Sequence, residues 1–144
     1  MTARIFIDGA AGTTGLEIHE RLGGRSDLKV VTLDDASRKD AGARKAALNQ
    51  SDVVILCLPD EAAREAVSTI DNPNVRVIDA STAHRVAKGW DYGFAEMDKG
   101  QRVKIAASKR VSNPGCYPTG FIALVRPLVA AGILPADFPL TVNA

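Results

Sequence analysis

The sequence predicts an α/β fold in which a mainly parallel sheet is covered by helices. Short apolar segments alternate with helical stretches along the chain, the order that parallel strands with helical crossovers require. One segment, residues 53–58 (VVILCL), has no charged residue, as expected for a strand buried on both faces. A glycine-rich turn separates the first apolar segment from the first helical stretch. Together these features favour a doubly wound, Rossmann-like sheet.

The individual elements follow from local periodicity and from turn residues. Strands are expected over residues 4–8, 29–33, 53–58, 76–79 and 103–107. Helices are expected from about residue 16 to the glycines at 23–24, over 41–48, from Asp60 to Thr69, and from Cys116 to Val129. We expect Asp60 to cap its helix and Pro127 to end or kink the last one. Residues 80–100 are expected to be irregular, and residues 139–144 to open a further strand.

Composition argues against several classes of partner. The chain has 144 residues, of which 46% are hydrophobic and 24% charged, and its net charge is +1. Nucleic acid and anionic membranes are therefore not expected to bind it. Two cysteines and two histidines without ligand spacing predict no metal site. No segment approaches the roughly 18 apolar residues of a membrane helix, and we expect a cytoplasmic protein with free thiols.

Three glycines are spaced G-x-x-G-x-x-G between the first strand and the first helix. A turn in this place directs backbone N–H groups and a helix N-terminus toward a pyrophosphate, which the missing side chains allow to approach. The alternative is a purely structural turn. The predicted dinucleotide contacts are Gly9, Ala11, Gly12, Thr13, Thr14 and Gly15.

The residues after the second strand leave the choice of dinucleotide open. Asp34 and Asp35 stand where an acidic residue commonly binds the ribose 2′-hydroxyl of NAD. Ser37, Arg38 and Lys39 follow at once, and a cationic pair suits the 2′-phosphate of NADP. A solvated, charged loop is a third interpretation. We take Ser37 and Arg38 as candidate cofactor residues.

Cys116 stands in the most specific segment of the chain. Asn113-Pro114-Gly115 predicts a turn, and Cys116 follows it at the start of an apolar helix. A helix N-terminus favours the thiolate, and nearby N–H groups can bind an oxyanion. Cys116 is therefore predicted to be a catalytic nucleophile, whereas Cys57 is expected to be buried in the sheet.

Residues 112–120 (SNPGCYPTG) resemble the active-site signature of the N-acetyl-gamma-glutamyl-phosphate reductases. The resemblance extends over essentially the whole chain and is similar to the shorter of the family's two forms. Only the cysteine segment is specific to this family; the other segments are shared with related semialdehyde dehydrogenases. Those segments are residues 9–15, 53–59, 79–85 and 92–96.

The resemblance implies an NADP-dependent reductase of arginine biosynthesis. Cys116 would displace phosphate from N-acetyl-L-glutamyl 5-phosphate, and reduction of the thioester by NADPH would give the 5-semialdehyde. Arg85 and Asn113 would bind the substrate, with a surface ion pair as the alternative role of Arg85.

The resemblance also implies a domain organisation. Residues 1–115 would form an NADP-binding Rossmann-like domain, and residues 116–144 the cysteine helix and the beginning of an α+β catalytic domain. The chain would then be a piece of a longer, homo-oligomeric protein. The family's catalytic histidine would lie beyond Ala144, so neither His19 nor His84 is interpreted as the base.

Two alternatives remain at this point. One is another acyl-phosphate reductase, of the aspartate-semialdehyde or the N-acetyl-aminoadipyl-phosphate type. Tyr117-Pro118-Thr119 argues against the former type, whereas the motif does not exclude the latter. The other is a non-catalytic dinucleotide-binding module with an inert cysteine, because one fold serves many functions.

Overall fold

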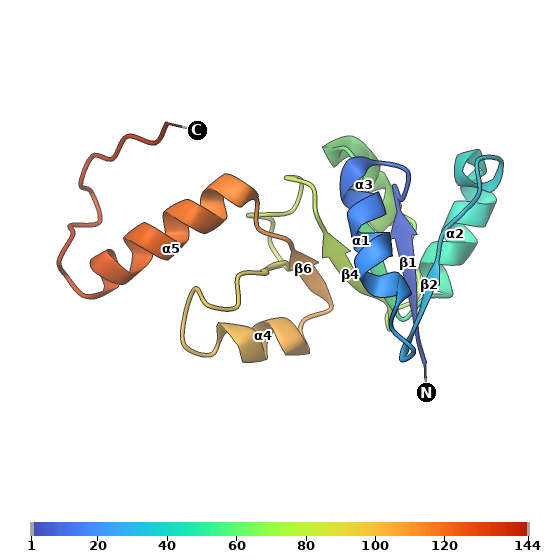
Figure 1. Cartoon of the computed structure of the whole chain (residues 1–144), viewed down its shortest axis with the longest axis horizontal. Helices are drawn as coiled ribbons and strands as arrows, with labels where there is room; N and C mark the ends of the chain where they lie inside the picture. The colour runs from blue at the N-terminus through green and yellow to red at the C-terminus, as the bar shows by residue number, and fades with distance from the viewer. Residues whose placement is uncertain (1, 144) are drawn as a thin grey trace.

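A computed structural model describes residues 2–143 (Figure 1). The strands are β1 (Ala3–Asp8), β2 (Leu28–Val31), β3 (Val53–Leu56), β4 (Arg76–Asp79), β5 (Asp91–Tyr92) and β6 (Arg110–Ser112). The helices are α1 (Thr13–Gly23), α2 (Ala41–Asn49), α3 (Asp60–Ser68), α4 (Gln101–Ala107) and α5 (Cys116–Ala130), with a short 3-10 helix η1 (Ser37–Lys39).

The strands form one sheet in the order β2-β1-β3-β4-β6-β5, and every neighbouring pair is parallel. This confirms the predicted α/β, Rossmann-like class. The chain proceeds from β1 outward to β2 and then returns past β1 to β3. Strand order therefore reverses between β1 and β3, which is where open α/β sheets bind ligands at the carboxyl ends of the strands.

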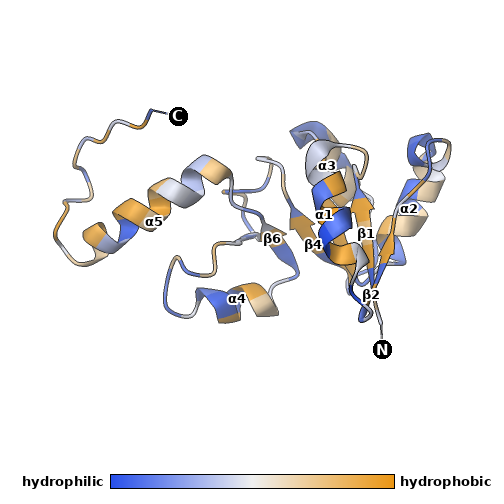
Figure 2. Cartoon of the chain, in the orientation of Figure 1, coloured by the Kyte–Doolittle hydropathy of each residue, from blue (hydrophilic) through white to orange (hydrophobic). Residues whose placement is uncertain are grey.

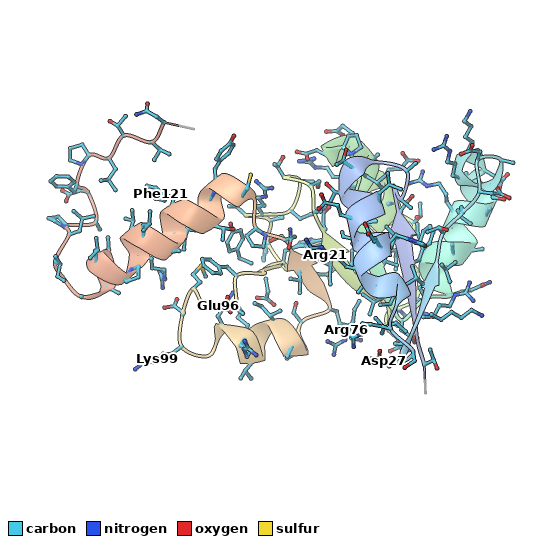
Figure 3. The ribbon with its side chains drawn as sticks, in the orientation of Figure 1. Arg21, Asp27, Arg76, Glu96, Lys99 and Phe121 are labelled. Carbon is cyan, nitrogen blue, oxygen red and sulfur yellow. The ribbon has the colours of Figure 1, made fainter. Side chains whose placement is uncertain are left out.

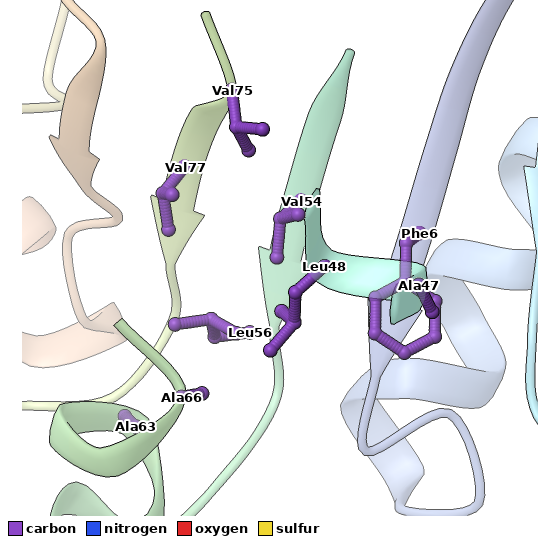
Figure 4. Close-up of a cluster of buried hydrophobic side chains, with 9 residues drawn as sticks. All are labelled: Phe6, Ala47, Leu48, Val54, Leu56, Ala63, Ala66, Val75 and Val77. Atoms are coloured by element: carbon purple, nitrogen blue, oxygen red, sulfur yellow. The ribbon is translucent and has the colours of Figure 1, made fainter. Parts of the chain in front are cut away.

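Helices cover the two faces of the sheet, as strand alternation requires. On one face, Phe6, Val54 and Val77 pack with residues of α2 and α3 in a buried cluster (Figure 4). On the other face, Ile55 lies opposite α1, with which it lines a shared cavity. Burial of such side chains contributes about 1.5–3 kcal/mol each and fixes the strand register that positions the turns.

Helix α5 stands apart from the sheet, and the segment after it extends further away (Figure 1). The helix is strongly apolar (Figure 2), yet none of its residues is buried. Two of its apolar side chains are exposed: Leu124 at 75% and Phe121, labelled in Figure 3, at 38%. The guanidinium of Arg126 connects α5 to the preceding loop, through the Met97 carbonyl at 2.8 Å and the Asp98 carboxylate. No helix among residues 2–143 has the length and apolar character needed to cross a membrane.

Residues 103–107, predicted to be a strand, lie in helix α4, so that prediction is wrong. The alternation of Val103, Lys104 and Ile105 is typical of a strand, but Val103 is exposed and has no strand beside it. Helix α4 is preceded by Gly100 with φ +88°, and the Gln101 side chain bonds to the Tyr92 carbonyl. The place next to β4 is taken by β6 instead.

Several element ends also differ from the predictions, and β2, expected to reach residue 33, ends at Val31. Strand β3 ends at Leu56, and Pro59 rather than Asp60 is the N-cap of α3. The Asp60 carboxylate instead accepts hydrogen bonds from the Thr82 N–H and hydroxyl. Helix α5 continues past Pro127 to Ala130. Gly132, two residues after the end of the helix, has φ +69° and donates its N–H to the Val129 carbonyl at 3.0 Å. Residues 139–143 form no strand, and residue 144 lies outside the described residues.

Candidate functional site

The glycine turn joins the carboxyl end of β1 to α1, and its three glycines have different reasons to be glycine. Gly9 has φ +86°, and a Cβ there would lie 2.2 Å from the Cys57 carbonyl oxygen. A Cβ on Gly15 would lie 2.4 Å from the Gly9 carbonyl oxygen. A Cβ on Gly12 would meet nothing closer than 3.5 Å, so packing inside the protein does not demand glycine there.

Gly12 is the N-cap of α1 and supplies no side-chain cap. The first N–H groups of a helix lack intrahelical partners, so Thr13, Thr14 and Gly15 present donors toward the open space at Gly12. Residues 12–15 line a cavity of about 330 Å³ together with Cys57, Leu58 and Ala80. This arrangement is suited to an anionic group such as a pyrophosphate.

Arg38 lies beside the same turn. It lines a small cavity of about 80 Å³ with Gly9, Ala11 and Asp35, and its guanidinium is 3.1 Å from the Asp35 carboxylate. Ser37 is not among the residues that line this cavity. Its backbone N–H donates to Asp34 at 2.7 Å, and this hydrogen bond lowers the pKa of that carboxyl. The structure thus brings Arg38 to the glycine turn, while the Ser37 N–H is capped by the Asp34 carboxylate.

Cys116 is exposed and is the first residue of α5, with Gly115 as N-cap. The Thr119 hydroxyl and N–H both bond the Gly115 carbonyl, at 2.7 and 3.0 Å. The Gly115 N-cap has no side chain that would occupy the first N–H groups of the helix. An exposed sulfur at a helix N-terminus is in the setting where a nucleophilic thiol is expected.

Arg85 lies against the residue that precedes the cysteine. A Cβ on Gly115 would be 2.8 Å from Arg85 Nη1 and 2.9 Å from Nη2, so glycine is needed for this approach. Arg85 Nε is buried without a hydrogen-bond partner, and the residue forms no ion pair among the described residues. A guanidinium in this state is available for an oxyanion.

Asn113 connects the two turns. Its N–H donates to the Asp79 carbonyl at 2.7 Å, and its side-chain Nδ2 donates to the Pro114 carbonyl at 3.2 Å. Asn113 and Thr14 line one cavity of about 380 Å³, whose wall also includes Ile55, Ile78 and Ala80. The glycine turn and the cysteine turn therefore border the same space at the carboxyl edge of the sheet.

Cys57 was predicted to be buried in the sheet, but the structure places it elsewhere. It follows β3 directly, is half-buried, and lines the cavity of the glycine turn. Burial raises the pKa of the Cys57 thiol, with smaller contributions from Asp79 and Asp8. Its position just after a buried parallel strand is the sequence signal that would have placed it at the ligand edge.

A second feature that the sequence did not indicate is a buried polar cluster after β4. The Asp79 carboxylate, fully buried, accepts from the Ser81 hydroxyl at 2.7 Å and lies 2.6 Å from His84 Nδ1. The His84 ring stacks on Trp90, with centroids 4.1 Å apart. Asp79, Ser81 and His84 lie within the segment 79–85, but neither the burial of Asp79 nor the stacking of His84 on Trp90 was predicted from the sequence. His19, by contrast, is exposed on α1.

Relatives of known name match the chain along its length. A profile described as "Semialdehyde dehydrogenase, NAD binding domain" matches residues 39–106. N-acetyl-gamma-glutamyl-phosphate reductase 2 of Pseudomonas putida is 62% identical over 143 residues, covering 99% of this chain and 46% of the relative. The chain is homologous to about half of an N-acetyl-gamma-glutamyl-phosphate reductase. The corresponding reductase of Chelativorans sp. gives the same identity, 62%, and the same coverage, 99% and 46%.

Solved structures resemble the chain in fold. Aspartate semialdehyde dehydrogenase with NADP from Candida albicans has a TM-score of 0.64 and 16% identity, over 91% of this chain and 48% of that one. Aspartate semialdehyde dehydrogenase II from Vibrio cholerae has a TM-score of 0.63 and 15% identity, over 91% and 47%. They share the Rossmann-like sheet, and the chain again spans about half of each.

Proposed function

We propose that the protein containing this chain is an NADP-dependent N-acetyl-gamma-glutamyl-phosphate reductase of arginine biosynthesis. It would reduce N-acetyl-L-glutamyl 5-phosphate to N-acetyl-L-glutamate 5-semialdehyde and release phosphate. The observation that carries the proposal is the setting of Cys116, exposed as the first residue of α5. The Arg85 guanidinium lies against the preceding glycine and forms no ion pair within residues 2–143. Homologues that are 58–62% identical carry the reductase name.

The residues at the glycine turn fit a dinucleotide. The space at Gly12, which a Cβ would fill without meeting the protein, admits a phosphate to the N–H groups of residues 13–15. Arg38, in the adjoining cavity, would bind the 2′-phosphate that distinguishes NADP from NAD. The Candida albicans relative in fold is a complex with NADP, which favours the same cofactor here. When bound, the cofactor supplies a hydride.

The cysteine turn would perform the covalent step. The Cys116 sulfur attacks the acyl carbon, the bond from that carbon to the phosphate oxygen breaks, and inorganic phosphate leaves with the electron pair. Free N–H groups in the first turn of α5 would stabilise the oxyanion that forms on the carbonyl oxygen. The Arg85 guanidinium would bind the departing phosphate, and Asn113 would contact the substrate from the shared cavity.

We also propose the domain boundary at residues 115 and 116. Residues 1–115 would bind the cofactor, and residues 116–144 would begin the catalytic domain. The absence of any buried residue in α5 and its exposed apolar side chains support this division. A homo-oligomeric state and a cytoplasmic location rest on the family resemblance and are proposed with it.

Replacement of Cys116 by serine in the full-length protein tests the proposed chemistry. We expect reductase activity to fall by at least about 10³-fold, because the nucleophile is lost. NADPH affinity, measured by fluorescence titration, should change by less than about twofold, because Cys116 is not part of the cofactor turn. Turnover close to the wild-type rate would remove Cys116 from the mechanism.

The same assay separates the alternatives when three acyl phosphates are compared. The proposed enzyme prefers N-acetyl-L-glutamyl phosphate to the L-aspartyl and N-acetyl-aminoadipyl phosphates. A binding module turns over none of them, and an acyl phosphate gives its Cys116 thiol no protection from an alkylating agent. In an enzyme, the acyl phosphate instead slows alkylation of Cys116 and leaves alkylation of Cys57 unchanged.

A further inference from the structure

The segment from residue 80 to residue 90 is irregular, but contacts fix it at both sides. Thr82 is bonded to the Asp60 carboxylate at the start of α3, through its N–H at 3.0 Å and its hydroxyl at 2.5 Å. On the sheet side, the Ser81 N–H and hydroxyl bond the Asp79 carboxylate, at 3.0 and 2.7 Å. The loop is thus held to α3 and to the end of β4.

His84 makes the innermost of these contacts. Only 8% of the residue is exposed, and its Nδ1 faces Asp79 Oδ2 at 2.6 Å. The two Asp79 carboxylate oxygens already accept from the Ser81 N–H and hydroxyl, so we assign Nδ1 as the donor to Oδ2. The Trp90 ring stacks on the His84 imidazole with an angle of 13° between the planes. We call these contacts of His84 with Asp79 and Trp90 the His84 anchor. His84 therefore has both its ring face and its ring edge fixed.

Asp79 couples this anchor to the cysteine turn. Its carboxylate is hydrogen-bonded to His84 Nδ1, while its backbone carbonyl accepts the Asn113 N–H at 2.7 Å. Asn113 begins the turn that leads through Gly115 to Cys116. One buried residue at the end of β4 thus contacts both the residue that precedes Arg85 and the turn that contains Gly115.

Arg85 directly follows the anchored histidine, and its own side chain has no comparable support. Its Nε is buried without a partner, and its terminal nitrogens lie against Gly115. A long, flexible side chain loses much rotamer freedom when held in one place, so its placement depends on what fixes the backbone beside it. The Arg85 N–H donates to the Thr82 carbonyl at 3.4 Å, and His84 is the adjacent residue whose side chain is held by its neighbours.

We propose that His84 is a positioning residue for Arg85. Its bond to Asp79 and its stack on Trp90 hold the guanidinium over Gly115, so that a fixed positive charge stands beside the Cys116 thiol. The role of that charge in binding the substrate's phosphate rests on the proposed function. The placement itself is independent of which acyl phosphate the enzyme uses.

The alkylation rate of Cys116 reports the nearby charge without requiring turnover. Iodoacetate is anionic and iodoacetamide is neutral, so the ratio of their rates rises when a positive charge stands near the thiolate. The ratio is measured on the full-length protein by mapping the Cys116 peptide, which excludes signal from Cys57. Arg85→Gln should lower the ratio by about threefold to fivefold, the effect of removing one nearby, partly screened unit charge.

Two His84 variants separate the bond from the ring. His84→Phe keeps an aromatic ring against Trp90 and loses the donor to Asp79, whereas His84→Asn keeps a donor. We expect His84→Phe to lower the ratio nearly as far as Arg85→Gln, and His84→Asn to restore at least half of the loss. His19→Asn, on the exposed face of α1, is the matched control and should leave the ratio unchanged.

Kinetics provide the second measurement. In the reverse reaction, His84→Phe should raise the KM for inorganic phosphate by about fivefold or more while the KM for NADP changes by less than about twofold. A general loss of structure would affect both. An unchanged alkylation ratio in a folded His84→Phe protein, or in Arg85→Gln, overturns the inference. A ratio that shifts as expected in a protein that turns over no acyl phosphate would refute the proposed function and leave the positioning role standing.

Discussion

Replacement of Gly9 by alanine tests how tightly the glycine turn packs on the end of β3. Gly9 has φ +86°, and a Cβ there would lie 2.2 Å from the Cys57 carbonyl oxygen and 2.8 Å from its carbonyl carbon. Gly89 has nearly the same φ, +84°, but a Cβ there would meet no atom within 4 Å. The pair therefore shares the backbone strain of a positive φ and differs in the contact with Cys57.

The expected magnitudes follow from these two contributions. Alanine at a positive φ costs about 1 kcal/mol, which applies at both positions. At Gly9 the overlap with backbone atoms adds about 1–3 kcal/mol, because a strand end must move to relieve it. We therefore expect a loss of about 1 kcal/mol for Gly89→Ala and about 3 kcal/mol for Gly9→Ala. For a domain of this size, these losses lower Tm by about 3 °C and about 9 °C respectively.

Thermal unfolding followed by circular dichroism measures both variants against the wild type. Melting temperatures for the two variants that agree within about 2 °C would refute the reasoning, since the Cys57 contact would then cost nothing measurable. A stabilised Gly9→Ala variant would also contradict the positive φ assigned to this turn.

Three further predictions concern the cofactor edge. Gly12→Ala should change the unfolding free energy by less than about 1 kcal/mol, since its Cβ has room, yet weaken NADPH by about tenfold or more; unchanged binding would place the pyrophosphate elsewhere. Arg38→Ala should weaken NADPH by about tenfold more than NADH, and equal losses in titration would show that Arg38 does not bind the 2′-phosphate. Burial raises the pKa of Cys57, so the thiol keeps its proton to higher pH in the folded protein. Alkylation of Cys57 at pH 8 should therefore be slower in the folded than in the urea-unfolded protein, and it should accelerate in the folded protein as pH rises above 9. Faster alkylation of Cys57 in the folded protein would contradict a raised pKa.

The strands that the sequence placed well are those whose apolar runs end at turn residues. Residues 76–79 form β4 as predicted, and residues 4–8 lie within β1. The prediction failed at residues 103–107, because a strand is decided by its neighbour across the sheet as well as by local alternation. The partner of β4 is β6, a three-residue strand too short to show a period.

In the candidate site, too, some features could be predicted from local sequence and others could not. Cys116 and residues 9–15 belong to contiguous motifs, and their surroundings are set by the next few residues, so local reasoning placed them at helix N-termini. The approach of Arg85 to Gly115 instead brings together residues 30 positions apart, and the Asp79 carbonyl likewise accepts from the distant Asn113. Such contacts arise from strand order, which no single stretch of sequence encodes.

Parallel strand direction is what allows residues a hundred positions apart to lie at one edge of the sheet. The glycine turn follows β1 and the cysteine turn follows β6, and both lie at the carboxyl edge because every strand pair is parallel. Reversing β6 alone would send its carboxyl end, and Cys116 with it, to the opposite edge. Strands β3 and β4 lie between β1 and β6, and the residues after them, Cys57 and Ala80, line the cavity of the glycine turn. A ligand that reaches from Gly12 to Cys116 must therefore pass over Cys57 and Ala80, and the small size of both side chains leaves it room.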